Sequence, residues 1–224
     1  DPENPPGSFG VPSDGGGAYI QGRGSLENCT VLGNLSSHTT GGVFWKSSFD
    51  PVDETVIRNN ILYSNSGFNL PSEAFVVTLE HNCIQDGIRL TNGNISSDPL
   101  IAADHRLSES SPCRNTGSNE AWMTGSGDYA GITRVINGDV DMGALEFVVP
   151  LVITQIQYAD EQVTLNWTSS PGAAYQLEGT DDLSANSWEK VGAAVTATGT
   201  VSSQTEAVVP RLRRFYRYRH ILFE

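Results

Sequence analysis

The feature that most constrains this chain is a repeat of short, β-prone segments that each begin at asparagine. The segment from Asn28 to Asn34 aligns without gaps on Asn59 to Asn65, and more loosely on Asn82 to Asp86. The offsets between these segments are 31 and then 23 residues. Such self-similarity marks stacked units that bury a core only together, and unequal offsets are typical of a β-solenoid with loops of different length. We therefore expect one solenoid coil for each repeat.

The composition agrees with many short strands. The 224 residues include 23 glycines, and no stretch shows sustained helical periodicity. Glycine with scattered asparagine and serine favours turns between short strands, so we expect an all-β protein with almost no helix.

Two further groups of residues, one before the repeats and one after them, narrow the type of repeat protein that the sequence indicates. A glycine-rich start, Gly15 to Tyr19, precedes the first repeat, which includes Leu26 and Glu27. The closing motifs are, in order, Asp98-Pro99-Leu100, Arg106-Leu107, Ser111-Pro112-Cys113, Gly117-Ser118-Asn119 and Val140-Asp141-Met142-Gly143-Ala144-Leu145-Glu146. From about residue 14 to 147, the chain resembles large secreted bacterial proteins built from right-handed parallel β-helix repeats. The resemblance implies terminal rungs and a closing segment over residues 1–147, on a secreted or cell-surface protein, and it implies no reaction.

Residues 148–224 have a different pattern. Apolar and polar residues alternate along several short segments, which are separated by turns such as Ser170-Pro171-Gly172 and therefore favour a small sandwich. The segments are 148–156, 162–168, 175–178, 188–191 and 215–218. This part resembles the fibronectin type III-like modules that end many exported bacterial proteins. The resemblance implies a fibronectin- or immunoglobulin-like β-sandwich over residues 148–224, with Trp167 as its core anchor and Tyr216 or Tyr218 late in the chain.

The chain is strongly acidic, with 26 Asp and Glu against 13 Lys and Arg and a formal net charge of −13. Residues 1–148 hold 18 of the acidic and 7 of the basic side chains. A surface of this charge repels nucleic acid and anionic membranes, so we expect no nucleic-acid partner. No apolar run approaches the roughly 20 residues that a membrane-spanning helix needs, so we expect no membrane span.

The start of the chain suggests a missing neighbour. The sequence begins Asp1-Pro2-Glu3 and enters the repeat almost at once, so we expect a piece of a longer protein. The first coil would then leave strand edges open, and the proline-rich residues 1–13 cannot extend a sheet regularly. We expect this end to be capped by an irregular arm or occupied by another polypeptide, such as the missing N-terminal part or a second copy.

The three cysteines suggest one disulfide. The repeat alignment places Cys29 and Cys83 at equivalent positions, with the Asn60 coil between them. Two coil spacings of about 4.8 Å separate their backbones by about 9.6 Å, which exceeds the reach of a disulfide of about 7 Å. We therefore predict a Cys83–Cys113 disulfide and a buried, unbridged Cys29.

The closing motif favours a cluster of ion pairs, which we call the latch. Asn137-Gly138 is a strong tight-turn dipeptide, and Asp141 and Glu146 lie close enough in sequence to share Arg134 as a counter-ion. The alternative is a Ca²⁺ site built from Asp128, Asp139, Asp141 and Glu146, although their spacing is not that of an EF-hand. We favour the latch and predict no cofactor, with Ca²⁺ as the alternative.

One insertion could carry catalysis. The candidates are Lys46, Asp50, Asp53, Glu54 and Arg58. In β-helix polysaccharide lyases, a carboxylate-bound Ca²⁺ acidifies the proton beside a uronate carboxylate, and Lys or Arg removes it. Mixed charge in a loop is more often solvated surface, and the sequence has no zinc or catalytic-triad motif.

A basic run near the C-terminus could bind acidic glycans. Its candidate residues are Arg213, Phe215, Arg217 and Arg219, which combine cations with an aromatic ring. The alternative, which we favour, is a strand whose arginines face outward and pair with acidic neighbours.

These patterns favour a non-catalytic extracellular or cell-surface protein that serves in adhesion or glycan binding. One alternative is a polysaccharide lyase or glycoside hydrolase whose groove lies mainly on upstream coils, and another is a structural stalk terminus. The expected partners are an extracellular polysaccharide or the missing N-terminal part of the protein.

Overall fold

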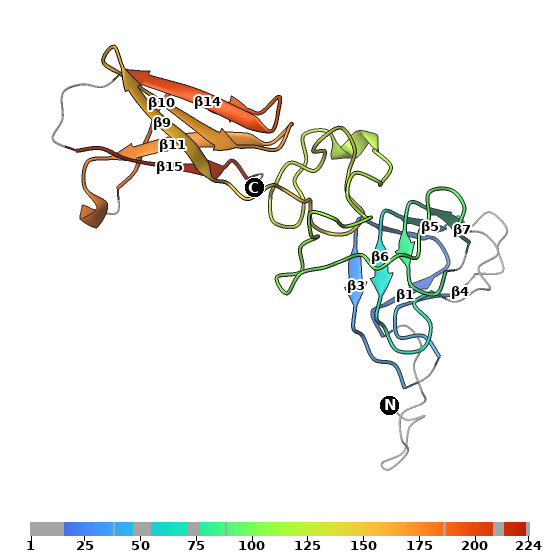
Figure 1. Cartoon of the computed structure of the whole chain (residues 1–224). Coiled ribbons are helices and arrows are strands. Elements are labelled where there is room, and N and C mark those ends of the chain that lie inside the picture. Colours follow the sequence, from blue (N-terminus) through green and yellow to red (C-terminus); the bar gives the residue numbers. More distant parts are fainter. Residues whose placement is uncertain are drawn as a thin grey trace. The chain divides into compact units, whose positions relative to one another are not determined.

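The computed structural model of the chain describes residues 16–37, 39–46, 55–70, 77–87, 89–185, 187–207 and 213–222. Their secondary structure is almost entirely β, with two short 3-10 helices at Ala121–Met123 and Leu183–Ala185, which confirms the all-β prediction (Figure 1). The described part has no helix that is long and apolar enough to cross a membrane. The arm predicted over residues 1–13 lies outside the described residues.

The chain divides into two compact units. The first consists of Asp1–Ser118 with Asp141–Ala144, and the second of Asn119–Val140 with Leu145–Glu224. The domain boundary after residue 147 stays a prediction.

Three passes of the chain build the first unit from parallel strands. The first pass contains β1 (Ala18–Gln21), β2 (Gly24–Glu27) and β3 (Thr30–Leu32), the second contains β4 (Val43–Lys46), β5 (Thr55–Arg58) and β6 (Ile61–Tyr63), and the third contains β7 (Val77–Glu80) and β8 (Cys83–Ile84). The sheets have the orders β1-β4, β2-β5-β7 and β3-β6-β8, and all of these pairings are parallel (Figure 1). The sheets are short and do not close, so the structure shows stacked parallel strands without showing a complete β-helix.

The strand register corrects the predicted repeat. Glu27 pairs with Arg58, which confirms the first offset of 31 residues. Arg58 pairs with Glu80 and Ile61 with Cys83, so the second offset is 22 residues and the predicted value of 23 is wrong. The error arose because two asparagines are adjacent at positions 59 and 60, and the sequence does not show which one stacks on Asn82.

Each pass turns between two of the sheets through a two-residue bend. The first residue of the bend has a positive φ, at Asn28 (51°), Asn59 (57°) and His81 (52°). The second residue is Cys29, Asn60 or Asn82, and its place in the stack is fixed by hydrogen bonds. Asparagine tolerates the left-handed conformation better than most residues, which explains its repeated occurrence at these bends.

Two asparagine ladders connect the passes. Asn60 Nδ2 donates to Asn82 Oδ1 at 2.9 Å, and Asn82 Nδ2 donates to Asn94 Oδ1 at 3.0 Å. At the other end of the pass, Asn34 Nδ2 donates to Asn65 Oδ1 at 3.0 Å. Asn28, the first residue of the first repeat, lies beside the first ladder, and its side-chain amide has no hydrogen-bond partner among the residues that the structure describes.

The predicted disulfide is absent from the structure. Cys29, Cys83 and Cys113 are all thiols, so the Cys83–Cys113 bridge is corrected to a pair of unbonded neighbours. A hydrogen bond with Cys83, together with burial, raises the pKa of the Cys113 thiol. The observed register makes Cys29 equivalent to Asn60 and Asn82, so the predicted equivalence of Cys29 with Cys83 is also wrong.

Two antiparallel sheets build most of the second unit. One has the order β14-β10-β9, formed by β9 (Ile153–Ala159), β10 (Gln162–Thr168) and β14 (Val201–Ala207). In the other, β11 (Ala174–Thr180) pairs with β12 (Glu189–Lys190), β13 (Val195–Thr196) and β15 (Phe215–His220). The strand predicted from Val148 begins only at Ile153, beyond Pro150, which cannot donate to a strand ladder.

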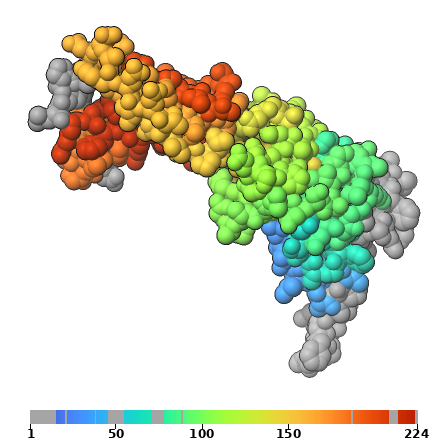
Figure 2. Space-filling view, in the orientation of Figure 1, coloured from blue at the N-terminus to red at the C-terminus, as the bar shows by residue number. Residues whose placement is uncertain are grey.

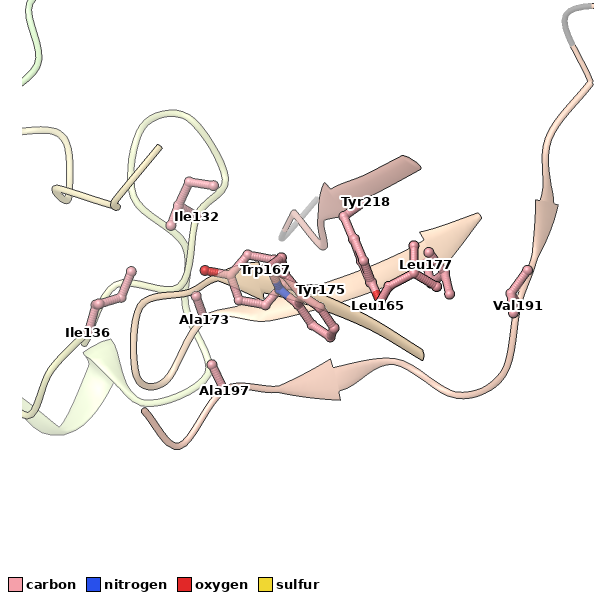
Figure 3. Close-up of a cluster of buried hydrophobic side chains, with 10 residues drawn as sticks. All are labelled: Ile132, Ile136, Leu165, Trp167, Ala173, Tyr175, Leu177, Val191, Ala197 and Tyr218. Atoms are coloured by element: carbon pink, nitrogen blue, oxygen red, sulfur yellow. The ribbon is translucent and has the colours of Figure 1, made fainter. Parts of the chain in front are cut away.

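The core of the second unit lies around Trp167, as predicted. Its ring is fully buried, stacks on Tyr218 at 3.8 Å between centroids and meets Tyr175 edge-on at 6.0 Å. Figure 3 shows Ile132 and Ile136 reaching the same cluster from the segment before the sheets. That segment therefore packs as part of the core of the second unit.

Candidate functional site

A cleft of about 550 Å³ opens on the second unit. Its walls come from the ends of β11, β12 and β15, from the residues after β15 and from a loop before the sheets. The lining residues are Tyr129, Ala130, Gly131, Gln176, Lys190, Arg219, His220, Ile221 and Leu222. Among the residues that the structure describes, no carboxylate lines the cleft, although acidic residues outnumber basic ones by two to one in the chain, 26 against 13.

Tyr129 is held out into solvent by a buried carboxylate. Asp128 Oδ1 accepts hydrogen bonds from the backbone N–H groups of Ala130 and Ile132, both at 2.8 Å. Its Oδ2 accepts another at 2.8 Å from the N–H of Glu146. These three bonds fix the loop on both sides of Tyr129, whose side chain is 90% exposed. A tyrosine in this setting offers a rigid aromatic face to a ligand.

Arg219 presents part of its guanidinium to the cleft. Glu178, on the neighbouring strand, is buried; it accepts a hydrogen bond from Arg217 Nε at 2.8 Å and forms an ion pair with Arg219, whose Nε lies 2.8 Å from Glu178 Oε1. Two guanidinium groups thus share one carboxylate, and one positive charge is left in excess. Arg217 is engaged further by the Trp188 ring, whose centroid lies 4.2 Å from its guanidinium carbon. Arg219 lines the cleft with a side chain that is 58% exposed.

Lys190 supplies the second cation of the cleft. It lies at the end of β12, its side chain is exposed, and it forms no ion pair with any residue that the structure describes. An ammonium group and a guanidinium fork in one cleft suit carboxylate or sulfate groups. The aromatic face of Tyr129 and the apolar side chains of Ile221 and Leu222 suit the carbon face of a sugar ring.

Only part of the predicted basic run near the C-terminus lies at this cleft. Arg219 lines it, whereas Arg213 donates from Nε to the carbonyl of Asp181 at 3.0 Å and lies 4.0 Å from the Asp182 carboxylate. Phe215 pairs with Thr180 at the far end of β15. Most of the arginines therefore pair with acidic neighbours, as the favoured interpretation of this run expected.

The predicted catalytic residues are not brought together in the described part of the chain. Arg58 Nε donates to Glu80 at 2.6 Å, and its Nη1 lies 3.6 Å from Glu27, so three successive passes contribute to one ion-pair stack. Asp50, Asp53 and Glu54 lie outside the described residues. Lys46 is the last residue of β4, and only its backbone is described.

The predicted Ca²⁺ ligands have other partners. Asp128 fixes the Tyr129 loop, Asp139 Oδ1 accepts from Asn119 at 3.2 Å, and Asp141 Oδ1 accepts from the Asn115 N–H at 2.7 Å. Glu146 forms a buried ion pair with Arg134 at 3.4 Å, as the latch predicted. Within the described ranges, no group of three or more His, Cys, Asp or Glu side chains could hold a metal ion.

Sequence reasoning missed Tyr129, Gln176 and Lys190. The signal for Tyr129 was available, because Gly127-Asp128-Tyr129-Ala130-Gly131 places an aromatic residue inside a turn-forming sequence that an aspartate can stabilise. No signal linked Gln176 or Lys190 to Arg219, because strand pairing alone brings them together. No protein-family model matches the chain, and no curated protein matches it significantly.

Proposed function

We propose that this chain is part of a non-catalytic extracellular or cell-surface protein, and that its second unit binds acidic glycans. The observation that carries the proposal is the cleft with Lys190, Arg219 and Tyr129, and with no carboxylate among its described lining residues, on a chain with a formal net charge of −13. A cationic cleft on an acidic protein selects small or flexible anions, while the overall charge repels a nucleic acid. A uronate-containing oligosaccharide combines the carboxylate and the sugar face that the lining residues fit.

The architecture supports this proposal. We propose that the three parallel passes are the last coils of a right-handed parallel β-helix, because their strands stack in register and asparagine ladders connect them. We also propose that the two sheets around Trp167 form a fibronectin type III-like sandwich. Both architectures suit a modular surface protein, although neither determines a ligand.

A matched pair of ligands tests the glycan proposal. Isothermal titration would compare oligogalacturonate with its methyl ester, which has the same sugar chain without the negative charge. We expect binding of the acid form alone, weakening with salt, and a loss of about tenfold in affinity for Lys190→Gln and for Arg219→Gln. Arg213→Gln is the control, because this arginine lies just before β15 and outside the cleft lining, and this variant should bind the ligand unchanged.

Three results would contradict the proposal. Equal affinity for the ester would show that charge is not recognised, and an effect of Arg213→Gln equal to that of Arg219→Gln would place binding outside the cleft. Ultraviolet absorbance from an unsaturated product would instead support the polysaccharide lyase alternative.

A further inference from the structure

Gln176 is a nearly buried lining residue of the cleft in the second unit. It belongs to β11, which pairs with β12 along one edge and with β15 along the other (Figure 1). The residue is only 5% exposed, yet it lines the cleft. A buried amide has few possible partners, so the hydrogen bonds that it makes decide what it offers to a ligand.

The amide of Gln176 is held in one orientation. Its Nε2 donates to Leu177 O at 2.8 Å and lies 3.4 Å from Val191 O and from Gly192 O. Turning the amide over would place its oxygen against these three carbonyl oxygens, where neither side has a hydrogen to donate. The nitrogen therefore faces the backbone, and Oε1 faces the other way.

Oε1 is the unpaired acceptor of this amide. Within the described part of the chain, no group donates a hydrogen bond to it. Gln204 shows the contrast, because its Nε2 donates to the same Val191 O at 2.9 Å, while its own Oε1 is fully buried and lies outside the cleft lining. An acceptor that borders a cleft bonds to water until a ligand replaces that water.

Gln176 lies between the two cations of the cleft. Arg219 is its direct partner on β15, and Lys190 lies opposite Glu178, the next residue on the same face of β11. Directly opposed side chains have Cβ atoms about 5 Å apart, and diagonal neighbours are about 7–8 Å apart. Figure 2 shows β15, in red, at the surface of the second unit. A sugar ring whose carboxylate binds Arg219 therefore also reaches Gln176.

A neutral acceptor gives a cationic cleft a selectivity that charge alone does not provide. Lysine and arginine attract any carboxylate, sulfate or phosphate. An acceptor of fixed orientation is satisfied only by a donor, so an anion without a hydroxyl displaces its water and leaves it unpaired. A uronate carries hydroxyls on the same ring as its carboxylate and supplies both groups.

We propose that Gln176 is the specificity-determining residue of the cleft, and that its Oε1 accepts a hydrogen bond from a ligand hydroxyl near the carboxylate that Arg219 binds. This inference rests on the proposed function and narrows the ligand class to hydroxylated sugar acids. Simple carboxylates and inorganic anions bind more weakly, although they carry negative charge as well.

Two acids of similar shape test the inference. Galacturonate carries hydroxyls around its ring, and tetrahydropyran-2-carboxylate has the same ring and carboxylate without them. We expect galacturonate to bind the parent chain about tenfold more tightly in NMR titrations, because the other acid leaves the acceptor unpaired. The ¹³Cδ signal of Gln176 should shift with galacturonate alone, which supplies a readout that does not depend on any variant.

Three variants locate the preference. Gln176→Met keeps the length of the side chain and removes the acceptor, so we expect the two acids to bind it with nearly equal affinity. Gln204→Met is the matched control, because it removes a donor to the same Val191 carbonyl outside the cleft lining and should leave the preference unchanged. Lys190→Gln should weaken both acids equally and so keep their ratio.

Other results would overturn the role of Gln176. Equal affinity for the two acids in the parent chain would do so while the acidic-glycan proposal stands, and so would oligogalacturonate binding without any binding of galacturonate. A preference that survives in Gln176→Met means that another group contacts the hydroxyl, and one that is lost equally in Gln204→Met depends on the packing around Val191 instead. If oligogalacturonate itself does not bind, the proposed function fails and this inference fails with it.

Discussion

At the scale of single residues, the Tyr218 hydroxyl is unusual. It is buried in the second unit without a hydrogen-bond partner among the described residues, and burial raises the pKa of Tyr218 above its ordinary value of 10.0. The neutral phenol is therefore favoured in the folded state. Its contribution to stability is present below pH 10 and is lost as the pH rises above that value.

Tyr218→Phe separates the contribution of the ring to stability from that of the hydroxyl. We expect the free energy of unfolding at neutral pH to stay equal or to rise by about 1 kcal/mol, because an unpaired buried hydroxyl is removed and the stack on Trp167 is kept. Above pH 10 the variant should lose less stability than the parent chain. Urea unfolding at both pH values measures this, and Tyr158→Phe, at a ring that is 66% exposed, should change neither value. A clear loss of stability at neutral pH would show that the hydroxyl has a partner.

At the scale of elements, the asparagine ladder holds the passes together more strongly than their short strands alone would. The fully buried Asn82 accepts from Asn60 and donates to Ile57 O and Glu80 O, each at 2.8 to 2.9 Å. We expect Asn82→Ala to destabilise the first unit by about 3 kcal/mol, because several buried polar groups lose their partner. Chemical denaturation measures the effect, and Asn166→Ala, at an exposed hydrogen bond, should cost less than about 0.5 kcal/mol. Similar losses in the two variants would contradict a special role for the ladder.

The elements also show how far sequence reasoning reaches. The repeat predicted parallel stacking and the first offset, because β-prone residues and bend asparagines recur along the chain. The predicted alignment of the third pass was wrong by one residue, because only the hydrogen bonds between Asn60 and Asn82 select the register there. The cleft was predicted only at Arg219, because Tyr129, Lys190 and Arg219 are far apart in sequence and no spacing connects them.

At the scale of the whole molecule, the two compact units predict independent unfolding. Trp167→Ala should destabilise the second unit by about 3 to 5 kcal/mol, because it removes the largest fully buried side chain of that core. The first unit should keep its own transition in differential scanning calorimetry. Ile57→Ala, at a fully buried residue of the first unit, should lower the other transition instead. One shared transition that moves in both variants would contradict two independently folding units.

The bends and the register together determine where this chain can change during evolution. The three bends keep two residues each, while the spacing between equivalent strands falls from 31 residues to 22 without a shift in pairing. The nine-residue difference lies in the arcs between β3 and β5 and between β6 and β7. Insertions and deletions are therefore tolerable in those arcs outside β4 and outside the ladder between Asn34 and Asn65, because they leave the pairing of β2, β5 and β7 in place. In the bends, a single added residue would turn the following side chains to the wrong face of the sheet. New loops for new partners can consequently be acquired along one side of the stack without refolding the rest.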